Sequence, residues 1–207
     1  MLNVGLTGGI ACGKSTVAKM FFEKGAHLID FDSLAHKVQE PGNTAWQKVV
    51  DYFGEEILQP DKKIDRVKLG NIVFADRRKL FELNKIVHPF VYQEWHCRLE
   101  RIGKKEKHAI VLSDVPLLFE GRKQHLFDLI MLVLIEPEEQ IIRLIARNRI
   151  SRAEAEKRLK SQMPIAKKIA LADIIIDNRG NLSETKKTVN KIWRELLQRE
   201  KKKNKIS

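Results

Sequence analysis

A glycine-rich stretch followed by a lysine and a serine carries the clearest chemistry in this sequence. Gly8 is followed, after four residues, by Gly13-Lys14-Ser15, which is the spacing of a P-loop. In such a loop, backbone N–H groups surround phosphates, the lysine reaches the β- and γ-phosphate oxygens, and the serine hydroxyl ligates Mg²⁺. The sequence therefore predicts that a nucleoside triphosphate and Mg²⁺ are bound by one continuous stretch: Gly8, Gly9, Ile10, Ala11, Cys12, Gly13, Lys14, Ser15 and Thr16.

Acidic residues end two further apolar segments. Segment 25–32 closes with Asp30 and Asp32, which strand alternation places on the same side. We expect Asp32 to deprotonate or orient an acceptor hydroxyl, although it could instead cap a helix starting near Ser33; Asp30 could organise Mg²⁺ through water. Asp114 follows the apolar run 109–113 where a Walker-B carboxylate would stand, so we expect it to hold Mg²⁺ through water, the alternative being a turn residue.

Arginines gather in one later segment and suit phosphate oxygens geometrically. They are Arg143, Arg147, Arg149 and Arg152. Arg143 and Arg147 share a helical face because they are four residues apart. A charged, solvated face is the alternative for any single arginine, but together they predict a lid from which one or two reach ATP.

These residues together fit phosphoryl transfer, which depends on positioning and electrostatics. They supply a P-loop for the phosphates, one carboxylate for the metal, one for the acceptor, and a set of cations. The sequence thus favours a small-molecule kinase. A kinase for a nucleoside monophosphate or a shikimate-like acceptor is a neighbouring alternative. A regulatory NTPase or a nucleic-acid-associated ATPase is the alternative from another class, although no guanine-reading Asn-Lys-x-Asp occurs.

Net charge and aromatic content bear on whether the protein binds nucleic acid. The net charge of +12 invites a nucleic-acid interpretation, yet much of the excess lies in short lysine runs, and two Tyr and three Trp offer little base stacking. We expect no nucleic-acid partner and a solvated, disordered end at the run beginning with Lys201.

The longest apolar run, Leu129 to Ile135, falls far short of the roughly 20 residues that cross a bilayer. The sequence also starts without a basic leader. We therefore expect a cytoplasmic protein that does not enter a membrane. Its two cysteines form neither a disulfide framework nor a metal cluster, and we expect reduced thiols.

Unbroken apolar runs joined by helical patterns predict an α/β fold with a parallel sheet buried on both faces, giving three layers and five strands. The expected strands are 2–6, 25–32, 109–114, 129–135 and 174–176. Residues 33–107 read as mostly helical, with a boundary or kink at His88-Pro89. Further helices are expected at 138–146, 152–163 (with Ser151 and Glu154 as a capping box) and 182–200.

We expect three functional parts. Residues 1–32, 108–140 and 165–207 form the nucleotide-binding core, 33–107 form a helical substrate domain, and 141–164 form the lid.

With these residues in view, the sequence resembles the dephospho-CoA kinase family over nearly its whole length. Five motifs occur in the family's order: Thr7-Gly8-Gly9-Ile10 leading into Gly13-Lys14-Ser15-Thr16; Ile29-Asp30-Phe31-Asp32-Ser33-Leu34-Ala35-His36; His88-Pro89; Asp114-Val115-Pro116-Leu117-Leu118-Phe119-Glu120; and Gln162-Met163 with Ala172-Asp173 and Asp177-Asn178-Arg179-Gly180. The segment from Asp114 to Glu120 is the most specific of them.

The resemblance implies MgATP-dependent phosphorylation of the ribose 3′-hydroxyl of dephospho-CoA, giving CoA and ADP in the final step of coenzyme A biosynthesis. Its implied partners are the small molecules ATP and dephospho-CoA, and we expect a monomer, with weak oligomerisation left open. By position, Asp32 would be the base, and Lys14 and Arg147 would stabilise the transferred phosphoryl group. Arg143, Arg147 and Asn178 would contact ATP, the last near adenine. Asp32, His88, Pro116, Leu117, Leu118 and Phe119 would contact the acceptor, although the side chains from Pro116 to Phe119 could equally be core.

The sequence departs from the family's usual pattern at Ala11-Cys12, where Gly and Ser are more familiar. Cys12 lies near a helix N-terminus and Lys14, so we expect its thiolate to be favoured and the activity to be sensitive to alkylation.

Overall fold

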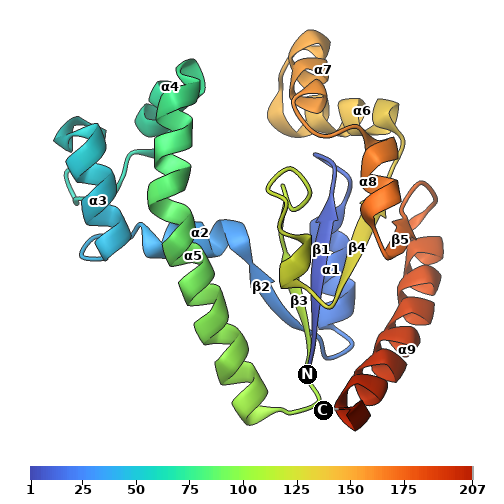
Figure 1. The fold of residues 1–207 in the computed structure, drawn as a ribbon. Coiled ribbons are helices and arrows are strands. Elements are labelled where there is room, and N and C mark those ends of the chain that lie inside the picture. Colours follow the sequence, from blue (N-terminus) through green and yellow to red (C-terminus); the bar gives the residue numbers. More distant parts are fainter. Residues whose placement is uncertain (207) are drawn as a thin grey trace. The chain divides into compact units, whose positions relative to one another are not determined.

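The computed structural model describes residues 1–206, and a five-stranded sheet lies at the centre of one part of it (Figure 1). The strands are β1 (Leu2–Gly8), β2 (His27–Asp30), β3 (Ile110–Asp114), β4 (Leu129–Leu134) and β5 (Ile174–Asp177). Their order is β2-β3-β1-β4-β5, and β1 pairs in parallel with both β3 and β4. This confirms the predicted α/β class with a parallel sheet. Because β1 is central, the loop after it emerges at the middle of the sheet edge.

The chain divides into two compact units. The first contains Met1–Ile29 and the residues from Ile102 onward; the second is Asp30–Arg101. The first unit holds the P-loop and these helices: α1 (Lys14–Phe22), α6 (Pro137–Asn148), α7 (Arg152–Lys160), α8 (Ile165–Leu171), α9 (Leu182–Ile206) and the short 3₁₀ helix η2 (Gln124–Leu126). In Figure 1, α6, α7 and α8 lie at the end of the sheet where β1 and β4 finish.

Apolar side chains from the strands, α1 and α9 form one core in the first unit. Phe21 of α1 lies against Trp193 of α9, with ring centroids 6.4 Å apart. The burial of β1 and of β4 up to Val133 explains why their sequences are nearly continuous apolar runs rather than alternating ones. Helix α1, which follows the P-loop directly, is thus held in place by its packing against α9.

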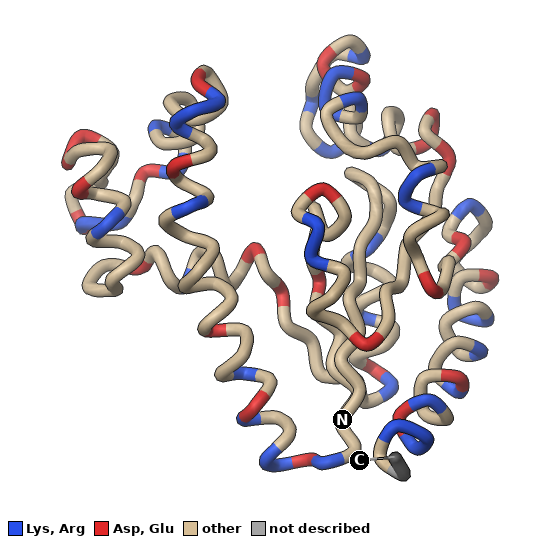
Figure 2. Tube along the Cα trace, viewed as in Figure 1, with Lys and Arg blue, Asp and Glu red and all other residues tan. Residues whose placement is uncertain are grey.

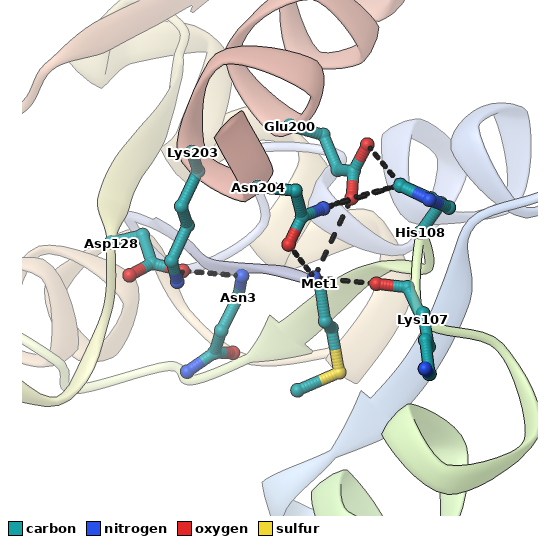
Figure 3. Close-up of polar contacts among 8 residues, drawn as sticks. All are labelled: Met1, Asn3, Lys107, His108, Asp128, Glu200, Lys203 and Asn204. Atoms are coloured by element: carbon teal, nitrogen blue, oxygen red, sulfur yellow. Dashed lines mark hydrogen bonds and ion pairs between the residues drawn. The ribbon is translucent and has the colours of Figure 1, made fainter. Parts of the chain in front are cut away.

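The end of the chain corrects the expectation of a disordered tail. Helix α9 continues to Ile206 instead of ending near residue 200. The carboxylate of Glu200 is buried and lies 3.5 Å from the Met1 amino nitrogen and 3.1 Å from His108 Nδ1, while Lys203 Nζ lies 2.6 Å from Asp128 Oδ2 (Figure 3). The lysine run therefore stays helical because Lys203 and Asn204 contact other residues of the first unit.

The second unit is helical. Its helices are α2 (Phe31–Val38), α3 (Thr44–Phe53), the short 3₁₀ helix η1 (Glu55–Ile57), α4 (Arg66–Ala75) and α5 (Arg77–Lys105), the last of which continues into the first unit. Phe31 packs on Tyr92 and Trp95, with ring centroids 5.9 and 5.7 Å away. The expectation of a mostly helical 33–107 agrees with these elements.

Two local predictions in this region were wrong. Strand β2 ends at Asp30 and α2 begins at Phe31, so Asp30 and Asp32 do not alternate along one strand. Asp30 is the N-cap of α2: it accepts hydrogen bonds from Asp32 N (3.0 Å) and Ser33 Oγ (2.7 Å). Helix α5 also has no boundary at Pro89; a kink, the alternative expected there, stays a prediction. Apolar residues on both sides of Pro89 are buried, including Val87 and Val91, so packing outweighs the backbone hydrogen bond that proline forgoes.

Candidate active site

The P-loop joins β1 to α1 through a backbone with two left-handed residues. Ala11 has φ 57° and Gly13 has φ 86°. Gly13 suits the left-handed conformation because it has no Cβ. For an alanine such as Ala11, the same conformation costs about 1–2 kcal/mol. Gly13 is also the N-cap of α1 and supplies no side-chain cap. The first turn of that helix therefore presents backbone N–H groups and the positive end of its dipole to an anion.

The glycines of the loop are required by close approaches. A Cβ on Gly9 would collide with the Gln140 amide, and one on Gly13 would collide with the Asn178 amide. A Cβ on Gly8 would lie 3.0 Å from the carbonyl oxygen of Val133. The spacing recognised in the sequence thus has a steric cause inside the protein, in addition to the space that a phosphate needs.

Side-chain amides from three distant segments hold the backbone of this loop. Gln140 Nε2 of α6 donates to the Ile10 carbonyl (3.0 Å), and the Ile10 N–H donates to Gln162 Oε1 (2.9 Å). Asn178 Nδ2, just after β5, donates to the Cys12 carbonyl (2.8 Å). The sequence analysis missed Gln140, and it recognised Gln162 only as part of a family motif, without a contact to the P-loop. Nothing in their local spacing shows that they converge on one loop.

Asn178 is fully engaged within the protein. While its Nδ2 holds the Cys12 carbonyl, its Oδ1 accepts a hydrogen bond from the buried Thr185 hydroxyl (2.8 Å). The structure therefore places Asn178 against the P-loop beside Gly13. A contact to adenine stays a prediction.

Lys14 and Asp114 are brought together although one hundred residues separate them. Lys14 Nζ forms an ion pair with Asp114 Oδ1, and both side chains are mostly buried. The sheet explains the pairing, because Leu6 of β1 is in register with Asp114 of β3 and the Val115 N–H donates to the Leu6 carbonyl (2.9 Å). Ser15 and Thr16 remain exposed at the start of α1.

The arginines of α6 and α7 differ in their surroundings. Arg143 lies by the P-loop, since a Cβ on Gly13 would be 3.6 Å from its Nη1. Arg147 is exposed, and its Nε donates to Asn148 Oδ1 (2.9 Å). Arg152 instead binds both carboxylate oxygens of Glu138 at 2.7 Å. Acidic and basic residues both occur along α7 in Figure 2, whereas α9 is mostly basic; Arg158 of α7 and Arg199 of α9 each pair with a glutamate four residues earlier.

The segment from Asp114 to Glu120 combines core and surface. Leu118 and Phe119 are fully buried, whereas Leu117 is half exposed. Of the two alternatives left open by the sequence, the side chains of Leu118 and Phe119 are core. The Pro116 carbonyl accepts a hydrogen bond from Thr7 Oγ1 (3.4 Å), which ties this segment to the central strand.

Glu120 ends that segment in a buried ion pair. Its Oε1 lies 2.8 Å from Nζ of Lys168, a residue only 1% exposed, and also accepts a hydrogen bond from the Met163 N–H (2.9 Å). Burial by itself raises the pKa of Glu120, but the contacts with Lys168 and Met163 outweigh it, so the pKa lies below its usual range. The Glu120 carboxylate is therefore charged at neutral pH.

Cys12 corrects the expectation of a favoured thiolate. Its side chain is 1% exposed. Burial raises the pKa of the thiol, and the Lys14 backbone N–H and the Lys14 charge lower it by less. Cys12 is thus a small residue packed beneath the loop. A buried thiol with a raised pKa gives no reason to expect easy alkylation.

Two predicted site residues belong to the helical unit. Asp32 is exposed in the first turn of α2, and its carboxylate makes no hydrogen bond or ion pair among residues 1–206. His88 is exposed on α5, with its ring edge-on to Tyr92 at a centroid distance of 6.2 Å. Residues 1–206 include no group of three or more His, Cys, Asp and Glu side chains that could hold a metal by themselves.

Comparison with known proteins decides the family. A family model described as "Dephospho-CoA kinase" matches residues 2–184. The chain belongs to the dephospho-CoA kinase family. Enzymes of this family are transferases that use ATP in the final step of coenzyme A biosynthesis.

Individual relatives and solved structures resemble the chain along most of its length. The dephospho-CoA kinase of Syntrophus aciditrophicus is 54% identical over 200 residues, covering 97% of this chain and 85% of that protein. A solved structure from Thermus thermophilus is 30% identical with a TM-score of 0.80, covering 93% of this chain and 96% of the other. The dephospho-CoA kinase from Campylobacter jejuni is 27% identical with a TM-score of 0.72, covering 94% and 96%.

No helix among residues 1–206 combines the length and the apolar character needed to cross a membrane.

Proposed function

We propose that this chain transfers the γ-phosphoryl group of ATP to the 3′-hydroxyl of the ribose of dephospho-CoA, forming CoA and ADP. The observation that carries the proposal is the Lys14–Asp114 pair at the mouth of a P-loop, in a chain of the dephospho-CoA kinase family. An NTP cradle alone would leave the acceptor open. Family membership supplies the acceptor that the cradle cannot.

On the donor side, Lys14 exchanges its contact with Asp114 for the β- and γ-phosphate oxygens when ATP binds. The N–H groups at the start of α1 surround the phosphates. Arg143, already beside Gly13, and Arg147 on the same helical face neutralise charge on the transferred group. Residues 141–164 serve as the lid that carries these arginines towards ATP and excludes water.

Ser15 and Asp114 fit a magnesium ion. An exposed hydroxyl and a carboxylate are hard oxygen donors, and Mg²⁺ bound with phosphates usually takes only one or two ligands from the protein. The lack of a larger cluster among residues 1–206 agrees with such a site. Bound there, Mg²⁺ would neutralise phosphate charge.

On the acceptor side, we assign Asp32 as the base that accepts the proton of the 3′-hydroxyl. Its carboxylate is exposed and is not committed to capping, because Asp30 already caps α2. Residues 33–107 serve as the helical substrate domain, in which His88 contacts the dephospho-CoA. In the first unit, Pro116 and Leu117 contact it, and Leu118 and Phe119 support these two residues from the core.

A coupled ADP-release assay tests this function with dephospho-CoA, adenosine, AMP and shikimate side by side. We expect rapid turnover with dephospho-CoA alone. Stimulation of ATP hydrolysis by RNA or DNA, without turnover of dephospho-CoA, would instead establish a nucleic-acid-associated ATPase.

The Asp32→Asn variant tests the base. It should bind ATP normally and lose ~10²–10⁴-fold in turnover, as is typical when acid–base participation is removed. The matched control is Asp51→Asn, the same change at another exposed carboxylate of the helical unit, which should keep full activity. Near-normal turnover of Asp32→Asn would remove Asp32 from the catalytic role.

A further inference from the structure

The turn between α7 and α8 is held at two consecutive residues by two different segments. Gln162 Oε1 accepts a hydrogen bond from the Ile10 N–H of the P-loop (2.9 Å). The next residue, Met163, donates its N–H to Glu120 Oε1 (2.9 Å). One short turn therefore joins the phosphate-binding loop to the end of the segment that begins with Asp114.

The Glu120 end of this connection is held by an ion pair. The carboxylate is paired with Lys168 at 2.8 Å; the lysine is 1% exposed and the Glu120 side chain 21% exposed. Separating the two would leave the buried lysine charge without its partner, which is costly. The ion pair therefore favours one position of Glu120, and through it one position of Met163 and of the neighbouring Gln162.

The loop end depends on side-chain amides for its shape. Both backbone polar groups of Ile10 are bound by glutamines, the carbonyl by Gln140 and the N–H by Gln162. The next residue, Ala11, is held in the left-handed conformation that alanine disfavours. Apolar packing against Ile141 and Leu144 of α6 also holds Ile10 and Ala11, while a cavity of about 350 Å³ adjoins Gly9, Gln140 and Gln162.

We propose that Gln162 is a positioning residue for ATP. Its hydrogen bond to the Ile10 N–H holds the P-loop in the conformation that receives phosphates, so that ATP affinity depends on how the α7–α8 turn is seated. Gln162 lies at the end of the segment 141–164 that we assign as the lid. The inference rests on the proposed kinase function and adds to it a direct link from the lid to the donor cradle.

The test compares Gln162→Met, which keeps length but removes the acceptor, with Gln162→Glu, which keeps an acceptor oxygen. Three quantities are measured: ATP affinity by calorimetric titration without acceptor, KM and kcat for each substrate, and hydrogen exchange of the Ile10 amide by NMR. Gln162→Met should weaken ATP binding about fivefold or more, the effect of one lost hydrogen bond, and should speed exchange at Ile10. Its KM for dephospho-CoA should stay unchanged, and its melting temperature should fall by no more than about 2–4 °C, the effect of about 1 kcal/mol in a chain of this size. Gln162→Glu should keep the Ile10 amide protected.

The matched control is Gln198→Met, the same change at an exposed position of α9, away from the P-loop and the α7–α8 turn. It should leave ATP affinity unchanged. The proposal is overturned if Gln162→Met binds ATP within twofold of the parent, if its Ile10 amide stays protected, or if Gln198→Met weakens ATP binding equally. If the parent binds ATP but does not phosphorylate dephospho-CoA, the proposed function fails, and the titration and exchange still decide the role of Gln162.

Discussion

The buried Glu120–Lys168 pair offers a sharp test of how this fold is held together. We predict that Lys168→Met destabilises the protein, because methionine fills similar space but leaves the Glu120 carboxylate with only the Met163 N–H among its present contacts. Breaking a buried pair by removing one partner costs about 3–5 kcal/mol. The Glu120 side chain is 21% exposed and keeps some hydration, so we expect a loss of about 2–4 kcal/mol in the free energy of unfolding.

The pKa of Glu120 determines how the loss of stability in Lys168→Met should change with pH. In the parent, the pKa of Glu120 lies below its usual range despite burial, so the pair contributes stability above the unfolded pKa of about 4.3, and this stability is lost as pH falls through the folded pKa. In Lys168→Met, burial acts without the lysine, and the pKa of Glu120 should rise above its usual range. The penalty should therefore be greatest near neutral pH and shrink as the carboxylate takes up a proton in acid.

Urea unfolding of parent and variant at about pH 7 and about pH 5 measures this directly. Lys167→Met is the matched control. Lys167 is the exposed neighbour of Lys168, so its substitution should change the free energy of unfolding by no more than about 0.5 kcal/mol. Adding Glu120→Gln to Lys168→Met should restore part of the loss at neutral pH. An equal loss at both pH values, or a loss no greater than that of Lys167→Met, would refute the reasoning.

Three smaller changes test other contacts. Ala11→Gly should raise the free energy of unfolding by about 0.5–1 kcal/mol, because relief of the left-handed alanine exceeds the added chain entropy; a lower thermal midpoint would contradict this. Ser151→Ala removes the cap that accepts the Glu154 N–H and should cost about 1 kcal/mol, seen as faster hydrogen exchange confined to α7; unchanged exchange would count against it. Thr185→Val leaves Asn178 Oδ1 without its buried donor and should cost about 1–2 kcal/mol and weaken ATP binding; normal stability and affinity would show that this bond does not support the loop.

The sheet and the P-loop could be predicted because their signals are local. A strand buried on both faces reads as an apolar run, and the loop's glycines and lysine occupy fixed spacings. Even the pairing of Lys14 with Asp114 follows once β1 and β3 are neighbours in a parallel sheet. The half of the capping box in which Ser151 accepts from Glu154 N was likewise visible in sequence.

The remaining features depend on distant contacts. Gln140 and Gln162 look like ordinary polar residues of a helix and a turn, and only the fold brings them to Ile10. The start of α2 at Phe31 was missed because Asp30, rather than Asp32, caps it. The uninterrupted α5 and the helical end of α9 were missed because buried neighbours outweigh local signals, proline in one case and a lysine run in the other.

The burial of Cys12 gives this protein a built-in kinetic probe. Cys97, exposed on α5, should react with a thiol reagent at once, whereas Cys12 is covered and has a raised pKa. Its modification must wait for a local opening of the loop. The labelling rate of Cys12 relative to that of Cys97 then measures how often the loop opens. A nucleotide that closes the loop should slow the labelling of Cys12 and leave that of Cys97 unchanged.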